Sequence, residues 1–273
     1  SSRPATDMVL QAVSGWMTLN RDPSGKPQRV NMVAIDVMSG LYAFQAVSTA
    51  LYRKAMKGVG THIELSLMEA AAALQSAPVV EHHFGINRAE GIGVPIGAFT
   101  TKDGFININA RRDPVFAKFC RLIGQEALID DPRFKTPAAR VENEAPLLAI
   151  IEEAIQTRTT AEWDRDLTEL DILHAAVNDY GDYLADAHVQ ETGVVSWVEH
   201  ETVGTIPMTK IPGLPAAESG NPNAHAPHIG EHTVEILAGL GFDENKIAAL
   251  RNANIIGQYD PDEAPANVGM APP

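Results

Sequence analysis

The clearest pattern of hydrophobic and polar positions is a helical one in the first quarter of the chain. Between residues 39 and 57, apolar side chains recur at Leu41, Phe44 and Leu51, a spacing of about 3.6 residues per turn. A short apolar segment, residues 30–35, comes before it. The pattern predicts a long amphipathic helix that follows a short run of apolar residues.

Two stretches alternate between apolar and polar residues, which is typical of strands. In residues 61–67 the odd-numbered apolar side chains share one face, and residues 105–110 should direct Ile106 and Ile108 inward. The polar and glycine-containing residues 101–104 come directly before the second stretch and predict a hairpin turn. The chain should therefore combine helices with strands.

Capping signals and apolar periodicity predict the other helices. Asp113-Pro114 places a cap residue and a proline at a helix start. Thr159 followed by Glu162 fits a capping box for another helix. Further amphipathic helices are expected at residues 8–19, 68–75, 113–123, 137–156, 231–239 and 244–252.

Composition and charge exclude some classes of partner. The chain has 273 residues, of which 45% are hydrophobic, an ordinary level for a globular protein. Its longest apolar runs are too short for a membrane-spanning helix, so no membrane is expected. The net charge of −14 argues against DNA or RNA, because no basic stripe is present to neutralise phosphates. Basic residues that hold an anionic ligand must then be few and local, or must come from sequence not present here.

Cysteine content and the N-terminus indicate a cytoplasmic protein. The first residues lack the apolar segment of a signal peptide. A single cysteine, Cys120, excludes an internal disulfide and suits a reducing compartment. Because Cys120 lies in the amphipathic segment 113–123, a packed core thiol is favoured over a nucleophile.

Asp36 is the strongest single candidate for chemistry. It ends the apolar segment, and the predicted helix follows at once, with Ser39 able to cap it and Gly40 allowing close approach. A carboxylate just before a helix N-terminus lies at the positive end of the helix dipole, which favours its ionised form. Backbone N–H groups near Ser39 and Gly40 could also stabilise an oxyanion. Taken alone, this pattern fits either a simple helix cap or a reactive carboxylate.

A series of short motifs settles which interpretation is favoured. Together they resemble the family III CoA-transferases, also called the CaiB/BaiF family, and they recur in the family's order along nearly the whole chain. The motifs are DMVLQAVSG at 7–15, Ile35-Asp36 with Ser39-Gly40, ALYR at 50–53, GVG at 58–60, IELSLMEA at 63–70, DDPRF at 130–134 with Arg140, and APHIGEHT at 226–233.

The resemblance implies a reaction and a set of site residues. Asp36 would be the catalytic nucleophile, which moves coenzyme A between an acyl-CoA and a free carboxylic acid through an aspartyl anhydride and an aspartyl thioester. Acyl-CoA would be a substrate, and no tightly bound cofactor or metal is expected. Tentative CoA contacts are Asp7, Gln11, Ser39, Gly40 and Arg53. A glycine-rich lid that excludes water is expected at Gly91, Gly93 and Gly97, where a plain linker is the alternative.

The histidines give only a weak indication of a metal site. His82 and His83 are adjacent, so their side chains would diverge on either a strand or a helix. His225, His228 and His232 come closer to ligand spacing, although the resemblance explains part of that cluster as a helix start. We therefore expect no metal.

The resemblance also implies an architecture. A Rossmann-like large domain, built from both chain ends, would carry an inserted small α/β domain, and two chains would interlock as a homodimer. The expected parts are residues 1–75 as the C-terminal part of the large CoA-binding domain, 76–98 as a linker with the glycine-rich loop, 99–192 as the small domain, 193–227 as a return linker, and 228–273 as C-terminal helices that pack on the large domain.

Two alternatives and one departure from the family remain open. The racemase branch uses a histidine followed directly by aspartate, whereas this chain has Thr6-Asp7, which argues against racemisation. A non-catalytic partner subunit of the same fold is the second alternative. The N-terminal third of the family, which supplies most of the CoA pocket, has no counterpart in this sequence, so a separate or missing N-terminal chain is expected.

Overall fold

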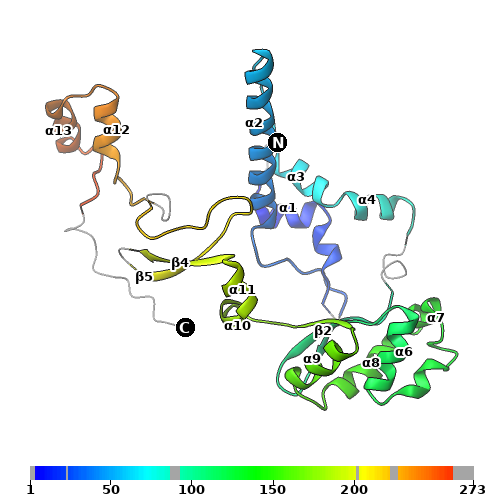
Figure 1. The fold of residues 1–273 in the computed structure, drawn as a ribbon. Helices are drawn as coiled ribbons and strands as arrows, with labels where there is room; N and C mark the ends of the chain where they lie inside the picture. Colours follow the sequence, from blue (N-terminus) through cyan, green and yellow to red (C-terminus); the bar gives the residue numbers. More distant parts are fainter. Residues whose placement is uncertain (1–3, 23, 87–92, 201–202, 222–226, 261–273) are drawn as a thin grey trace. The chain divides into compact units, whose positions relative to one another are not determined.

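The computed structural model describes residues 4–22, 24–86, 93–200, 203–221 and 227–260. The chain divides into two compact units, Ser1–Ala176 and Val177–Pro273, and each is described by itself (Figure 1). Both contain helices and a small sheet: three strands in the first unit and two in the second. The predicted mixture of helices and strands is therefore confirmed.

The first 86 residues are mainly helical. Their elements are α1 (Asp7–Val13), the 3₁₀ helix η1 (Trp16–Leu19), α2 (Ala34–Lys57), α3 (Leu67–Leu74) and α4 (Ser76–His83). Leu10, Ile35 and Ala71 form a small buried core that joins α1, α2 and α3. This core holds the beginning of α2.

The rest of α2 presents apolar side chains to solvent. Its buried residues, Ile35 and Ser39, lie in its first two turns. From Val37 to the end of the helix, a series of large apolar side chains is between 50% and 74% exposed. These residues are Val37, Leu41, Phe44, Val47, Leu51, Tyr52 and Met56. An apolar surface of this length is typical of a site that contacts further protein.

Helix boundaries near the N-terminus differ from the prediction. The helix expected from residue 39 begins at Ala34, so Ser39 lies inside it and cannot cap it. The helix expected over 8–19 is interrupted at Gly15, whose φ of +86° is left-handed and ends α1 before η1 begins. The stretch expected to be a linker from residue 76 starts with helix α4.

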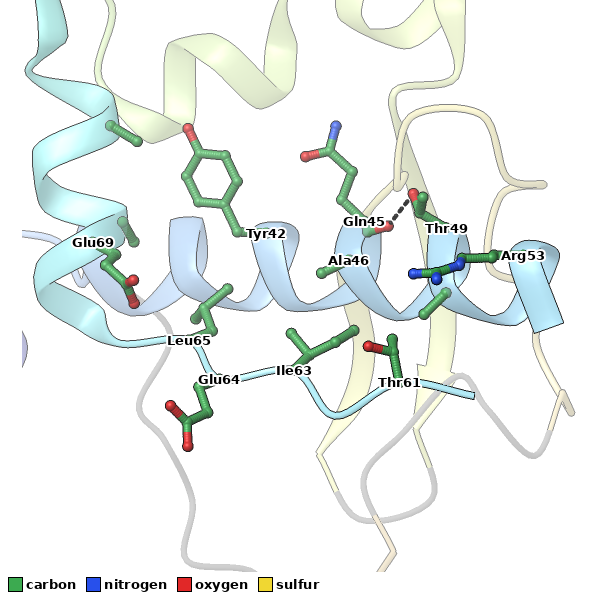
Figure 2. Close-up of a pocket in the computed structure, with 13 residues that line it drawn as sticks. Tyr42, Gln45, Ala46, Thr49, Arg53, Thr61, Ile63, Glu64, Leu65 and Glu69 are labelled. Atoms are coloured by element: carbon green, nitrogen blue, oxygen red, sulfur yellow. Dashed lines mark hydrogen bonds between the residues drawn. The ribbon is translucent and has the colours of Figure 1, made fainter. Parts of the chain in front are cut away.

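The strand predicted at 61–67 does not form in the described residues. The segment is extended, and α3 begins at Leu67 with a capping box between Ser66 and Glu69. Its side chains do alternate, since Ile63 and Leu65 point toward α2 while Glu64 points away (Figure 2). A strand also needs a hydrogen-bonded neighbour, and none of the described residues provides one.

The hairpin was predicted correctly. Strands β1 (Ile96–Thr100), β2 (Phe105–Asn109) and β3 (Leu173–Ala176) form an antiparallel sheet in the order β1-β2-β3. The amide of Thr101 donates to the carbonyl of Gly104 at 2.9 Å, which closes the turn. Ile106 and Ile108 are fully buried, as their alternation requires.

Helices pack on this sheet around the main core of the chain. They are α6 (Asp113–Leu122), the 3₁₀ helix η2 (Glu126–Ile129), α7 (Pro137–Glu142), α8 (Glu144–Ile155) and α9 (Thr160–Glu169). The helix expected over 137–156 breaks at Asn143, whereas the capping box of Thr159 and Glu162 is confirmed. Cys120 is buried in this core, and burial raises the pKa of its thiol to about 12. The thiol is therefore unreactive at neutral pH.

A buried arginine ties this part of the fold together. The Arg140 guanidinium is fully buried and donates to the carbonyls of Val94 at 3.1 Å, Phe134 at 3.1 Å and Arg111 at 2.8 Å. It also pairs with the Asp113 carboxylate at 2.7 Å. One planar side chain thus satisfies acceptors from four separate positions.

The second unit is smaller and consists of helices and one hairpin. Its elements are α10 (Tyr180–Ala185), α11 (Ala187–Thr192), β4 (Val195–His200), β5 (Gly204–Thr209), α12 (Thr233–Gly239) and α13 (Glu244–Asn252). Strands β4 and β5 pair in antiparallel fashion. The two C-terminal helices lie close to where the sequence predicted them.

Both sheets in the described part of the chain are antiparallel, so the parallel sheet of a Rossmann-like domain is not among these elements. Within the same residues, no helix has both the length and the apolar character needed to cross a bilayer.

Candidate active site

Asp36 lies in the first turn of α2, two residues after the helix begins. Its side chain is exposed, and no hydrogen bond or ion pair engages its carboxylate within the described residues. A negative charge in the first helical turn is stabilised by the helix dipole. The structure therefore presents an accessible carboxylate at the positive end of a long helix, as the sequence predicted, although inside the helix rather than before it.

A carboxylate distant in sequence caps this helix. One oxygen of Asp7, Oδ2, accepts from the amide of Ile35 at 2.6 Å and from the amide of Asp36 at 3.3 Å. The other oxygen accepts from the side-chain amide of Gln11 at 2.5 Å. These amides belong to the first helical turn, where N–H groups have no partner within the helix.

Gln11 holds the chain that leads into α2. Its side-chain amide also donates to the carbonyls of Val30 and Met32, both at 3.2 Å, and its oxygen accepts from the amide of Val30 at 3.0 Å. Asp7 and Gln11 are only 3% and 1% exposed. Both side chains are thus engaged within the chain itself, and their contact with CoA stays a prediction.

Ser39 and Gly40 lie inside α2, and their contact with CoA stays a prediction. The Ser39 hydroxyl is buried and donates to the carbonyl of Ile35 at 2.7 Å. Both residues lie beyond the first turn, where N–H groups belong to the helical hydrogen-bond ladder. Their amides are therefore not free to stabilise an oxyanion. Gly40 is exposed, and a side chain at its position would meet open space.

Arg53 lies in a groove, not beside Asp36. The groove has a volume of about 560 Å³ and lies between α2, residues 61–65 and α3 (Figure 2). Arg53 follows Asp36 by 17 residues in the same helix, which places it about 25 Å further along the axis. The predicted residues Asp7, Gln11, Asp36, Ser39 and Gly40 thus lie at or near the start of α2, and Arg53 lies apart from them.

The groove contains residues that the sequence analysis missed. Its polar side chains on α2 are Tyr42, Gln45 and Thr49, together with Arg53. They follow a spacing of three or four residues, so they form a polar stripe on the same helix as the apolar one. That spacing is readable in the sequence, but it lies on a different face of α2 from the apolar stripe.

The glycine-rich lid stays a prediction. Gly91 lies outside the described residues. Gly93 has a φ of +80°, which favours glycine. Gly97 lies in strand β1, where it pairs with Ile108 of β2. Because the sheet fixes Gly97, a mobile lid would have to end before this residue.

Histidine and carboxylate positions do not suggest a metal site in the part of the chain that the structure describes. His228 stacks on Tyr259 with ring centroids 4.1 Å apart, and its backbone amide donates to the Glu231 carboxylate. Asp131 accepts from Arg133, whose guanidinium keeps the pKa of that carboxyl below its usual value. The Asp130-Asp131 motif thus has a local, structural explanation.

Comparison with known proteins gives this arrangement a family. The sequence profile of CoA-transferase family III matches residues 1–233, and the chain belongs to this family. It is 30% identical over 271 residues to the human succinyl-CoA:glutarate CoA-transferase, and the aligned region covers 95% of this chain and 61% of that protein. It is 29% identical over 257 residues to the acetyl-CoA:oxalate CoA-transferase of Acetobacter aceti, and the aligned region covers 89% of this chain and 63% of that protein.

Solved structures show the same likeness. A CaiB/BaiF family protein from Brucella suis superposes with a TM-score of 0.73 at 25% identity, over 87% of this chain and 63% of that one. The Rv3272 protein of M. tuberculosis gives a TM-score of 0.67 at 30% identity, over 78% of this chain and 57% of that one. The chain thus spans about three fifths of the length of the relatives it matches.

Proposed function

We propose that the whole protein to which this chain belongs transfers coenzyme A from an acyl-CoA to a free carboxylic acid, with Asp36 as the covalent nucleophile. The observation that carries the proposal is the exposed carboxylate of Asp36 in the first turn of α2, on a backbone fixed from outside the helix by Asp7. Membership of CoA-transferase family III supports it.

The first half of the reaction transfers CoA to the protein. The ionised Asp36 carboxylate attacks the thioester carbonyl, the carbon–sulfur bond breaks, and CoA leaves as a thiolate with an aspartyl–acyl anhydride left behind. The thiolate then attacks the aspartyl carbonyl. The donor acid leaves as a carboxylate, and CoA is bound to Asp36 as a thioester.

The second half repeats these steps with the acceptor. The acceptor carboxylate attacks the aspartyl thioester, which releases the CoA thiolate and forms a second anhydride. The thiolate attacks the acceptor's carbonyl in this anhydride, giving the new acyl-CoA and the free Asp36 carboxylate. Because water would hydrolyse each anhydride, the site must exclude it, which is the role proposed for the segment containing Gly91 and Gly93.

We propose that Arg53 contributes to binding the CoA phosphates, since it is the arginine in the groove beside α2. The relatives named above act on succinate, glutarate and oxalate by their names, so short dicarboxylic acids are the first acceptors to assay. No tightly bound cofactor takes part in the proposed steps.

An isotope experiment separates CoA transfer from the racemase alternative. With a branched acyl-CoA in deuterated water, we expect CoA to move to an added acid while the α-carbon keeps its protium, because Thr6 occupies the position of the racemase histidine. Mass spectrometry of the recovered thioesters measures both events. Rapid α-deuteration without an acceptor acid would show that racemisation is the true activity, and absence of both would favour a non-catalytic subunit.

We also propose the architecture that the resemblance implies for the whole protein. A Rossmann-like large domain would contain residues 1–75 and 228–273, with residues 99–192 as the small domain, 76–98 and 193–227 as linkers, and further N-terminal protein alongside. The exposed apolar face of α2 and the unpaired segment 61–66 support it, because both fit surfaces that more protein covers. A cytoplasmic location is part of the same proposal.

The proposed homodimer is interlocked, so folding and association should be inseparable. We expect sedimentation of the whole protein at nanomolar concentration to give a particle of two chains. A compact, folded species with the mass of one copy would contradict the interlocked dimer.

A further inference from the structure

We infer that Asp7 and Gln11 are positioning residues for the reaction, which hold the start of α2 so that Asp36 faces its substrate in a fixed geometry. The inference rests on the function proposed above. It assigns to these two side chains a role different from contact with CoA.

Helix α2 cannot cap its own N-terminus. The residue at the cap position is Val33, which has no polar side chain, and no side-chain cap comes from this position. The amide of Val37 donates to the carbonyl of Val33 at 3.1 Å, so the ladder begins there. The amides of Ile35 and Asp36 precede the ladder, and Asp7 accepts from both. The backbone of Asp36 is thus fixed directly by Asp7.

Gln11 completes the arrangement on the other side. It occupies the second oxygen of Asp7 and makes three further hydrogen bonds, to the carbonyls of Val30 and Met32 and from the amide of Val30. The two side chains are one helical turn apart on α1, so a single rigid turn holds both the approach to α2 and its first amides. The bond between Asp7 and Gln11 and the bond from the amide of Ile35 are buried, and the bonds to Val30, Met32 and Asp36 are partly buried.

The two oxygens of the Asp7 carboxylate matter as well as its shape. A carboxylate can accept from the helix amides with one oxygen and from Gln11 with the other. An asparagine in its place has one oxygen only, and its NH₂ group would face the NH₂ group of Gln11. Rotation of the asparagine amide cannot preserve every one of these hydrogen bonds, because the Gln11 side chain is already held by Val30 and Met32.

The test is Asp7→Asn in the whole protein. We expect kcat for CoA transfer to fall about 100-fold, the cost of a misplacement of roughly 1 Å at the reacting group. KM for the acyl-CoA should change less than about threefold, because Asp7 does not touch CoA. Gln11→Met, which keeps the volume and removes the hydrogen bonds, should lower kcat about 10-fold. Hydrogen exchange at the amides of residues 35 and 36 should accelerate in Asp7→Asn.

Asp243→Asn is the matched control. Asp243 also caps a helix, accepting from the amide of Lys246 at 2.8 Å, but it lies at the start of α13 in the second unit. The same chemical change there should leave kcat unaltered and exchange at residues 35 and 36 unchanged.

The outcomes separate this inference from the function it rests on. If the wild type transfers CoA and Asp7→Asn has an unchanged kcat per folded molecule, or an effect on KM alone, the positioning role is wrong and the function stands. If the wild type transfers no CoA, the proposed function fails. In that case, faster hydrogen exchange at residues 35 and 36 in Asp7→Asn would still show that Asp7 caps α2, but the positioning role in catalysis would fail with the proposed function.

Discussion

Asp36→Asn is expected to abolish CoA transfer, lowering kcat by roughly three orders of magnitude or more. The amide has nearly the same size as the carboxylate but is a very poor nucleophile, so neither the anhydride nor the enzyme–CoA thioester can form. The expected loss is large because every proposed step passes through this one carboxyl group. A continuous assay of acyl-CoA exchange between two acids measures it.

The same variant should remain folded. The Asp36 carboxylate makes no hydrogen bond or ion pair within the described residues, and loss of a charge from a first helical turn costs only about 0.3–1 kcal/mol. Asp22→Asn is a suitable control, since Asp22 is a half-buried aspartate whose bonds to Ser24, Lys26 and Gln28 stay within its own loop. Near-normal turnover in Asp36→Asn, with asparagine confirmed by mass, would rule out the covalent role.

The largest effect on stability is expected from Arg140→Ala. The change removes the donors of the buried carbonyls of Val94 and Phe134 and of the partly buried carbonyl of Arg111, and it leaves a cavity in the main core. Each buried acceptor left unsatisfied costs about 1–3 kcal/mol, and the cavity adds to this, so we expect a loss of about 3 kcal/mol or more in the free energy of unfolding. Urea denaturation followed by circular dichroism measures this loss.

Two further substitutions sharpen this test. Arg140→Lys should retain the charge but still lose about 2 kcal/mol or more, because a single ammonium cannot reach acceptors spread around a planar guanidinium. Arg121→Ala is the control, since its pair with Glu126 is exposed and should contribute less than about 1 kcal/mol. Equal stability of the Arg140 and Arg121 variants would show that the buried network does not stabilise this core.

Local signals predicted much of the region around the hairpin. The turn at 101–104, the inward side chains Ile106 and Ile108, and the capping box at Thr159 depend on residues close in sequence. Such features need only dihedral preferences, side-chain alternation and short hydrogen bonds, all of which the sequence displays directly.

The errors occurred where distant residues decide the structure. The start of α2 was misplaced because its cap, Asp7, lies 28 residues before Ile35, and no local rule identifies such a partner. The prediction of a strand at 61–67 was wrong because alternation of apolar and polar residues determines only which way the side chains point. A strand also needs a hydrogen-bonded neighbour, and the described residues do not contain one for this segment. Arg140 was noticed as part of a motif, but its four acceptors could be found only in the structure.

The candidate site was predicted in part for the same reason. Asp36 stood out because a lone carboxylate beside a long amphipathic helix is visible in sequence. Its support by Asp7 and Gln11 was not visible, and both were assigned to ligand contact instead. A polar side chain in an amphipathic helix fits either a ligand or a buried network, and only burial distinguishes the two.

The most direct test of the central claim is peptide mass spectrometry of the whole protein after incubation with acyl-CoA and hydroxylamine. Hydroxylamine attacks the activated aspartyl carbonyl, so the account predicts a hydroxamate on Asp36, formed only when acyl-CoA is present and absent from Asp36→Asn. An unmodified Asp36 in protein that is actively transferring CoA, or a hydroxamate on a different carboxylate, would contradict it.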